Sequence, residues 1–477
     1  MEKQQQIEID FTEFHDSGRL GIIDFSDEAD FLHFIVEWVA SDENSDKAHT
    51  FRSAHHACRA ASITQSEYRR HPMEHLDLKI AIVGAGIGGL TLALALREHG
   101  IDVQLYEQTD ELREVGAAVA LSANATRFYE RMGLRAAFDA VCAEIPALIY
   151  RDGRSGETIG QHRGEPGYRE QFGGSYWGVH RADLQAVLSQ AVGLERINLS
   201  HRLTDLVQHP DRVSLSFANG RQIDADLVIG ADGARSITRR WMLGYDDALY
   251  SGCSGFRGVV PAERMDLLPD PEAIQFWVGP QGHLLHYPIG DKGDQNFLLV
   301  ERHPSPWPSR DWVTSASEGE QLRLFKDWHP AVVQMITAVP ISQRWGLFHR
   351  PPLGRWSKGR VTLIGDAAHA LVPHHGQGAN QSIEDAVVLA AQLAKAGPGR
   401  WREAQEAYER LRRGRTRKVQ YASITTADVL HLPDGPEAQA RNARLRERDS
   451  LLHHLDWIHD FDALAQEPTE RQGGTWL

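Results

Sequence analysis

Four residues near the start of the chain have the types and spacing of a dinucleotide site. Gly84, Gly86 and Gly89 form a GxGxxG sequence, and Glu107 follows Gly84 by 23 residues. The first glycine permits a tight turn, the second lets the backbone approach a pyrophosphate, and the third lets a helix pack closely on a strand. A carboxylate at position 107 can accept hydrogen bonds from a ribose. We therefore predict a dinucleotide site here, with Gln108 beside it.

The residues around this fingerprint predict the strand, turn and helix that such a site requires. The apolar run LKIAIV at 78–83 is typical of a buried strand, and the residues up to Gly100 show helical periodicity. A second apolar strand is predicted at 101–108, at the spacing of a βαβ unit. Because the chain carries one such fingerprint, we expect one tight dinucleotide site, and a second nucleotide would visit only transiently.

Two aspartates later in the chain also follow predicted strands. Asp232 and Gly233 follow a strand in ADLVIGADGARS (225–236), and Asp366 ends the run RVTLIGD (360–366). An aspartate at the carboxyl end of a parallel strand can hold a ribose or ribityl hydroxyl. A glycine-rich loop follows Asp366 and leads into a helix predicted at 380–396, whose N-terminus can face an electron-rich ring edge. The residues of interest in this loop are Gly376, Gly378, Ala379 and Asn380.

The rest of the chain contains segments with different sequence patterns. Residues 212–224 predict a hairpin with Asn-Gly at its turn, and residues 250–304 alternate like the strands of a separate antiparallel sheet. The last 75 residues have a charged, helical pattern. Their arginine-rich run, LRRGRTRKVQ at 411–420, could be a phosphate-binding patch, but we interpret it as a solvated helix face because three glutamates precede it.

The composition excludes several classes of protein. The 477 residues include 51 Lys and Arg against 65 Asp and Glu, a net charge of −14 that argues against a nucleic-acid or anionic-membrane surface. No apolar run is long enough to span a membrane, and no secretory signal begins the sequence. Three widely spaced cysteines suit a reducing cytoplasm, and neither HExxH nor a CxxC pair suggests a metal site.

The acidic charge is concentrated in an N-terminal extension, residues 1–75. Residues 1–77 hold 16 acidic against 7 basic side chains, so the other 400 residues are close to neutral. Three interpretations stay open for this extension. It would be a disordered or partly helical appendage, a partner-docking segment, or upstream sequence included by a start codon placed too early, since Met73 lies just before the first strand.

The three motifs GAGIGGL, GADGARS and GDAAHALVPHHGQGANQSIEDA, in this order, resemble the signatures of single-component FAD-dependent aromatic hydroxylases. This is the group of salicylate hydroxylase, 3-hydroxybenzoate 6-hydroxylase and 6-hydroxynicotinate 3-monooxygenase, and the resemblance covers residues 78 to about 460. It implies an α/β fold: a Rossmann-like FAD-binding domain, interrupted by an antiparallel β-sheet substrate domain and followed by C-terminal helices. It further implies non-covalent FAD, reduction by NADH or NADPH, and oxygen insertion through a flavin C4a-hydroperoxide.

The expected domain boundaries combine these motifs with the pattern of elements. The FAD-binding domain would consist of residues 76–180, 181–249 and 346–400. The second part contains Asp232–Gly233, here called the DG motif, and the third contains Gly365–Asp366, here called the GD motif. The substrate-binding sheet would occupy 250–345, and the C-terminal helices 401–477.

The resemblance also assigns roles at the cofactor. Glu107 would take the adenosine ribose, Asp366 the ribityl chain, and Arg181 the flavin side. The DG motif would serve both FAD and the visiting nicotinamide nucleotide. The remaining residues expected near the cofactor are Leu203, Asp232, Gly233, Gly376, Gly378, Ala379 and Asn380.

Hydroxylation by an electrophilic oxygen needs an electron-rich ring, which a base produces by taking a phenol proton. His283 and Tyr287 lie four residues apart in GPQGHLLHYPIG, so they share one face of a strand, whereas His286 points to the other. They match an H-x-x-x-Y arrangement that faces substrate in the hydroxynicotinate and hydroxybenzoate enzymes. His374 matches a loop histidine near the flavin. We therefore expect His283, Tyr287 and His374 to be catalytic.

The leading hypothesis is an NAD(P)H-dependent FAD monooxygenase that uses O2 on a small phenolic or hydroxylated heteroaromatic acid, as a cytoplasmic monomer or homodimer. One alternative is a flavin reductase or dehydrogenase of the same fold that does not use oxygen. Another is a flavin-binding interaction protein that docks a partner through the acidic segment.

Overall fold

The computed structural model describes residues 78–112, 118–163, 167–245, 247–303, 306–397, 399–447, 455–463 and 465. All of them belong to one compact unit, Met73–Leu477. The extension expected at residues 1–75 lies outside the described residues. None of the helices in the described ranges is both long and apolar enough to cross a membrane.

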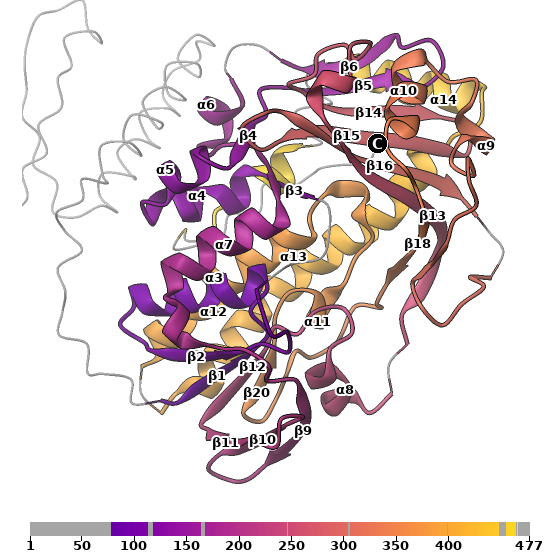
Figure 1. Cartoon of the computed structure of the whole chain (residues 1–477). Helices are drawn as coiled ribbons and strands as arrows, with labels where there is room; N and C mark the ends of the chain where they lie inside the picture. The colour runs from indigo at the N-terminus through magenta and orange to yellow at the C-terminus, as the bar shows by residue number, and fades with distance from the viewer. Residues whose placement is uncertain are drawn as a thin grey trace, which may run out of the picture. The chain divides into compact units, whose positions relative to one another are not determined.

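A six-stranded sheet carries the three sequence motifs (Figure 1). Its central strands are parallel and buried, as expected of a sheet covered on both faces. Its order is β19 (Ser357–Lys358), β20 (Val361–Leu363), β12 (Leu227–Gly230), β1 (Ile80–Val83), β2 (Val103–Tyr106) and β8 (Ile197–Asn198). The strand–helix–strand unit at the fingerprint forms as predicted, with α3 at Ile87–Glu98 between β1 and β2.

Helix α3 packs on both α7 (Arg181–Val192) and α12 (Gly378–Ala396) beside this sheet. Their contacting faces are rich in Ala and Leu, which permit close helix packing, and nearly all of α3 is buried. The long helix α13 (Trp401–Leu430) packs on α12 and runs on towards a second sheet (Figure 1). The C-terminal region is helical as predicted, and α14 spans Pro436–Arg446.

The second sheet has eight strands and is larger than the sequence suggested. Besides strands from the expected range 250–345, it includes β5 and β6 from the segment assigned to 76–180, and the β14–β5 pair is parallel. The alternating pattern of a strand does not show which distant strand it will pair with, so the β14–β5 pairing was not predicted. The order is β17 (Val313–Ser315), β18 (Gln343–His349), β13 (Leu249–Val260), β16 (Asp294–Arg302), β15 (Gly282–Ile289), β14 (Ile274–Gly279), β5 (Leu148–Asp152) and β6 (Thr158–His162).

Two three-stranded sheets and several short helices complete the fold. The predicted Asn-Gly hairpin forms between β10 and β11. The strands are β9 (Leu203–Gln208), β10 (Val213–Phe217) and β11 (Gln222–Ala225) in one sheet and β3 (Ala118–Leu121), β7 (Trp177–His180) and β4 (Cys142–Glu144) in the other. The helices are α4 (Ala123–Arg131), α5 (Arg135–Asp139), α6 (Tyr168–Phe172), α8 (Ile237–Leu243), α9 (Leu322–Phe325), α10 (Pro330–Thr337) and α11 (Asp366–His369).

Strand β7 joins the cofactor region to the eight-stranded sheet. It packs against β15 at Gly178, where a Cβ would lie 1.9 Å from the Pro288 carbonyl oxygen and 3.1 Å from Cδ2 of Tyr287. Only glycine allows such an approach of two backbones, so this contact fixes how close the two strands lie.

A buried ion cluster joins α12 to α13. Arg412 pairs with both Glu384 and Asp385, with Nε 2.8 Å from the Asp385 carboxylate, and Arg415 holds Glu384 with bonds of 2.7 and 2.8 Å. Both carboxylates and Arg412 are completely buried. Although burial would raise the pKa of Glu384, the two arginines hold it below its usual value.

The cluster corrects the interpretation of the arginine-rich run at 411–420. Arg412 is fully buried and Arg415 is 7% exposed, so these two side chains form neither a solvated face nor a phosphate patch. Arg417, by contrast, is exposed. The solvated-face interpretation was wrong for the two residues whose partners lie on another helix.

Replacing Arg412 with Met should destabilise the protein by about 3–5 kcal/mol, because it leaves buried carboxylates without their counter-charge. Urea unfolding at neutral pH would measure this loss. The matched variant Arg417→Met, on the exposed face of the same helix, should change stability by less than about 0.5 kcal/mol. Equal effects in the two variants would contradict the role given to the cluster.

Candidate active site

The glycine fingerprint forms the turn between β1 and α3. Gly84 has φ +104°, and a Cβ there would lie 2.5 Å from the Ala231 carbonyl oxygen. At Gly89 a Cβ would lie 2.1 Å from the carbonyl oxygen of Gly84. The first and third glycines therefore serve the tight turn and the close packing that the sequence predicted. Gly86 is the residue that precedes the first turn of α3.

Glu107 lies at this turn. One carboxylate oxygen accepts a hydrogen bond from the Ala85 amide at 2.8 Å, and the other accepts one from the Thr109 amide at 3.0 Å. The neighbouring Gln108 is exposed. The carboxylate thus lies beside the glycine turn, where a ribose would be within its reach.

Helix α7 presents Gln185 to the same turn. Arg181 is its first residue, and Gln185, one turn later, donates to the Ala85 carbonyl at 3.0 Å. Leu203 is buried at the start of β9. Gln185 was not predicted, although its place one helical turn after Arg181 was a usable signal.

Asp232 binds the first turn of helix α8, whose N-cap residue is Ser236. Its carboxylate accepts hydrogen bonds from the Ser236 hydroxyl at 2.5 Å and from the amides of Ile237 and Thr238 at 2.8 and 2.9 Å. Burial raises the pKa of Asp232, and these bonds oppose that effect. Gly233 follows with φ +73°. The carboxylate therefore has a structural task, and its role towards a nucleotide stays a prediction.

Asp366 is the first residue of α11, at the end of the strand that carries the GD motif. Among the described residues its carboxylate has no hydrogen-bond partner, and it lies near Gly378, where a Cβ would be 3.9 Å from Oδ1. Gly378 and Ala379 begin α12, after Gly376 with φ +63°. A half-exposed, unpaired carboxylate beside a helix N-terminus can accept hydrogen bonds from ligand hydroxyls.

Asn380 holds the first turn of α12 against β3. Its side-chain oxygen accepts from the Ser122 amide at 3.0 Å, and its nitrogen donates to the carbonyls of Ala120 and Gly376 at 3.0 and 2.9 Å. The amide is thereby occupied by backbone groups. The cofactor contact predicted for Asn380 stays a prediction.

The three motifs meet at one edge of the sheet. Gly84, Asp232 and Asp366 follow the carboxyl ends of neighbouring strands β1, β12 and β20. Arg239 of α8, almost fully buried, donates to the carbonyls of Ala367 and Ala368 at 3.1 and 2.8 Å and so ties the DG motif to the GD motif. This edge combines a glycine turn, the unpaired carboxylate of Asp366 and helix N-termini, which fits a dinucleotide.

Three histidines from three elements gather at the eight-stranded sheet. Nδ1 of His283 on β15 lies 2.6 Å from Nε2 of His431, which follows α13. The ring of His374 lies 5.4 Å from that of His283 and 6.4 Å from that of His431. In the described chain, Nε2 of His283, Nδ1 of His431 and both nitrogens of His374 are buried without a hydrogen-bond partner.

Burial keeps these imidazoles neutral. It lowers the pKa of His374 to about 4 and holds the pKa values of His283 and His431 well below 6.5, with the neighbouring histidines adding to the effect on both. Neutral imidazoles with free ring nitrogens can act as bases. Within the described ranges, no three or more His, Cys, Asp or Glu side chains are arranged to hold a metal ion.

Tyr287 shares the His283 face of β15, as predicted. It packs with Leu285, whereas His286 faces the opposite side and bonds Gln295 at 3.0 Å. Burial raises the pKa of Tyr287, while the positive charges of Arg181 and Arg257 act in the other direction. The side chain of Arg257 on β13 is solvent-exposed, yet surrounding protein lowers its pKa to about 10.

Arg257 and His431 were both missed by sequence reasoning. Arg257 is a lone arginine in a strand of glycines and apolar residues, which was a signal that could have been used. His431 follows a long charged helix and carried no comparable signal.

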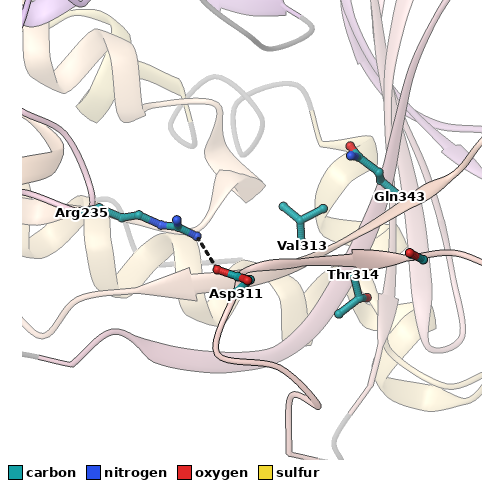
Figure 2. Close-up of a pocket in the computed structure, with 6 residues that line it drawn as sticks. Arg235, Asp311, Val313, Thr314 and Gln343 are labelled. Atoms are coloured by element: carbon teal, nitrogen blue, oxygen red, sulfur yellow. Dashed lines mark ion pairs between the residues drawn. The ribbon is translucent and has the colours of Figure 1, made fainter. Parts of the chain in front are cut away.

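A recess of about 370 Å³ lies next to the DG loop (Figure 2). Arg235, two residues after Gly233, extends into it from one side and lies 3.8 Å from Asp311. The opposite wall is made by β17 and by Gln343 of β18. None of the three predicted catalytic residues lines this recess.

The chain resembles known proteins over most of its length. A family model described as FAD binding domain matches residues 77–423. 3-Amino-4-hydroxybenzoate 2-monooxygenase of Streptomyces cremeus is 36% identical over 383 residues, which cover 80% of this chain and 95% of the relative. 3-Hydroxybenzoate 6-hydroxylase 1 of Aquipseudomonas alcaligenes is 33% identical over 400 residues, or 81% of this chain and 98% of the relative. This chain belongs to the FAD-dependent aromatic hydroxylase family.

A solved structure supports the same conclusion for the fold and the cofactor. Klebsiella pneumoniae HpxO complexed with FAD and uric acid is 30% identical and superposes with a TM-score of 0.68, covering 77% of this chain and 93% of HpxO. The predicted hydroxylase family, fold class and use of FAD with NAD(P)H are thereby confirmed. FAD is therefore the dinucleotide expected at the edge that carries Gly84, Asp232 and Asp366, and the contacts of these residues with it stay a prediction.

Replacing Asp366 with Asn should lower the FAD content of the purified protein, because the variant loses the charged acceptor for ribityl hydroxyls. The ratio of flavin to protein absorbance measures this. Asp291→Asn, an exposed acid in the turn after β15, should retain full flavin content. An Asp366→Asn protein with undiminished flavin would contradict the assigned site.

Stability should fall as the pH drops from 6.5 to 4. Buried His286 and His374 both have pKa values near 4 when folded, whereas the unfolded chain binds these protons near pH 6.5. Each contributes roughly 3 kcal/mol that is present above pH 6.5 and lost across this window. Urea unfolding at several pH values should show a shallower decline in His286→Gln than in the unmodified protein. Parallel curves would contradict this assignment.

Proposed function

We propose that this hydroxylase acts on a small phenolic or hydroxylated heteroaromatic acid, with His283, Tyr287 and His374 as its catalytic residues. The observation that carries the proposal is the group of buried, unpaired imidazole nitrogens of His283, on the sheet that packs against the cofactor region, and of His374, in the loop before α12. Buried polar atoms rarely lack partners in proteins. A polar group of a bound ligand would satisfy them.

The hydroxyl of the ring would bind at these nitrogens. A neutral imidazole accepts the phenol proton, and the phenolate that results is the electron-rich ring needed for attack by an electrophilic oxygen. Bound FAD, reduced by NAD(P)H, would supply that oxygen from O2. The contribution of the protein is to hold the ring, exclude water and take the proton.

The carboxylate of the substrate would bind at the other end of this face. Arg257 and Arg181 both place positive charge near Tyr287. His283 and Tyr287 are four positions apart on an extended strand, a span of about 13 Å, so the two side chains would contact different parts of the bound substrate. Arg257 is the better ligand for a carboxylate because its exposed guanidinium has no carboxylate partner among the described residues.

The relatives support this class of substrate, since the names of both include a hydroxybenzoate. We also propose that the protein works in the cytoplasm, as a monomer or homodimer. The alternative of a flavin-binding interaction protein depends on residues 1–75, outside the described chain. The alternative of a reductase that uses no oxygen has no support from relatives named monooxygenase and hydroxylase.

A screen of aromatic acids tests the proposal. The holoenzyme should oxidise NAD(P)H faster with one of 3-hydroxybenzoate, 3-amino-4-hydroxybenzoate or 6-hydroxynicotinate, and mass spectrometry should find one added oxygen per product. NAD(P)H oxidation without any hydroxylated product would favour the reductase.

Arg257→Met should raise KM for the preferred acid by about 30- to 150-fold, the equivalent of a lost charge-assisted hydrogen bond of about 2–3 kcal/mol. The matched phenol that lacks the carboxylate provides the control, because its KM should change little. Steady-state kinetics with both compounds make the comparison. Equal losses for the acid and the phenol would show that Arg257 does not bind the carboxylate.

A further inference from the structure

We propose that His431 is the positioning residue that sets the tautomer of His283 and receives the proton that His283 takes from the substrate. The proposal deepens the proposed function, since it rests on His283 as the base. It assigns a task in hydroxylation to the residue that follows the long C-terminal helix α13, 148 positions from His283 in the chain.

The pair has the geometry of a single strong hydrogen bond. Nδ1 of His283 and Nε2 of His431 are 2.6 Å apart, and both rings are buried. Between two neutral imidazoles, one nitrogen of this contact must carry the hydrogen and the other must accept it. The contact leaves Nε2 of His283 and Nδ1 of His431 outside the bond, and only one of these two nitrogens carries a hydrogen at a time.

Two arrangements of the hydrogens satisfy this contact. If Nδ1 of His283 donates, its Nε2 has a free lone pair and can act as a base, while His431 carries its one ring hydrogen on Nδ1. If Nε2 of His431 donates, Nε2 of His283 carries a hydrogen and cannot act as a base. His431 thus decides whether His283 is ready for catalysis.

Proton transfer converts the first arrangement into the second. The substrate O–H bond breaks as an N–H bond forms at Nε2 of His283. The Nδ1–H bond of His283 breaks as a bond forms at Nε2 of His431, and the Nδ1–H bond of His431 then releases its proton to water. One proton enters and one leaves, so neither ring needs to stay charged in a buried site.

Two charged residues near the surface lie close to these histidines. The positive charge of Arg302 on β16 lowers the pKa of His431, and the negative charge of Asp428 on α13 raises the pKa of His374 against the larger effect of burial. Arg302 and Asp428 form an ion pair with each other, and both are largely exposed. The titratable groups near the pair are thus His374, Arg302 and Asp428, and the proposal places the release of the proton to solvent at this exposed ion pair.

The backbone holds His431 in place. Its amide donates to the Ala427 carbonyl at 3.1 Å, and its carbonyl accepts from the Gln281 amide at 3.2 Å. Gln281 lies at the turn before β15, two residues from His283. The bond to Ala427 holds His431 to the end of α13, and the bond from Gln281 joins it to the turn before β15, beside the His283–His431 bond.

Two variants separate positioning from packing. His431→Phe preserves most of the volume and removes the bond, whereas His431→Gln keeps an amide oxygen that can accept from Nδ1 of His283. Both should retain FAD. The kcat for hydroxylation should fall about 10- to 100-fold in the Phe variant and less in the Gln variant, with KM within about threefold of the unmodified enzyme. Activity of the Phe variant should recover as pH rises, because the phenol then ionises without help.

His286→Gln is the matched control, since His286 is equally buried on the opposite face of β15. Its pH profile should match that of the unmodified enzyme. A kcat and pH profile in His431→Phe equal to those of the unmodified enzyme would overturn the proposal, and so would a loss that is equal at every pH.

Nitrogen-15 NMR of histidine-labelled holoenzyme supplies a readout that needs no turnover. Nδ1 of His283 should carry the hydrogen in the unmodified protein, and His431→Phe should give a mixture of tautomers. An unchanged tautomer overturns the role of His431 whatever the kinetics show. If instead the tautomer changes but no acid is hydroxylated by the unmodified enzyme, the proposed function fails and the coupling of the two histidines stands.

Discussion

The ion cluster between α12 and α13 is the interaction on which the arrangement of the site depends. It withdraws two carboxylates and two guanidinium groups from water, and such a set is tolerable only when every charge has its counter-charge. Asn124 adds a bond of 2.6 Å to Glu384, and His369 of the GD motif lies 2.5 Å from Asp385. The cluster thus connects α4, α11, α12 and α13.

This connection positions both the cofactor end of the site, at Asp366, and the histidine end, at His431. Helix α12 begins at Gly378, beside the Asp366 carboxylate, and α13 ends next to His431. The loop that carries His374 immediately precedes α12 and packs on α13, where His375 bonds Thr426 at 2.8 Å. A shift of α13 along α12 would therefore move the histidines relative to the cofactor edge, and the directional bonds of the buried ions oppose such a shift.

Local signals predicted the parts of the fold whose causes are local. The glycine turn, its flanking strand and helix, and the Asn-Gly hairpin depend on residues within a few positions of one another, and each formed where it was expected. Gly84, Asp232 and Asp366 were each expected near the cofactor, and they meet because neighbouring parallel strands bring their carboxyl ends to one edge. His283 and Tyr287 could be placed on one face because strands alternate.

The missed features all depend on contacts between distant segments. Arg412 looked solvated because its partner Glu384 lies 28 positions earlier on another helix. The pairing of β5 with β14, and that of His431 with His283, join segments more than 100 residues apart. Hydrophobic periodicity reports which face of an element is buried but not what covers it.

The close contact of Gly178 with Pro288 has a consequence for exchanging parts between relatives. The backbone of β7 lies directly on that of β15, and the same contact reaches the ring of Tyr287. If the eight-stranded sheet came from another hydroxylase, its backbone would have to approach Gly178 in the same way. Otherwise the tyrosine at position 287 would be displaced. Gly178 and Tyr287 therefore depend on each other's position, and a chimaera of these enzymes should take both from the same parent.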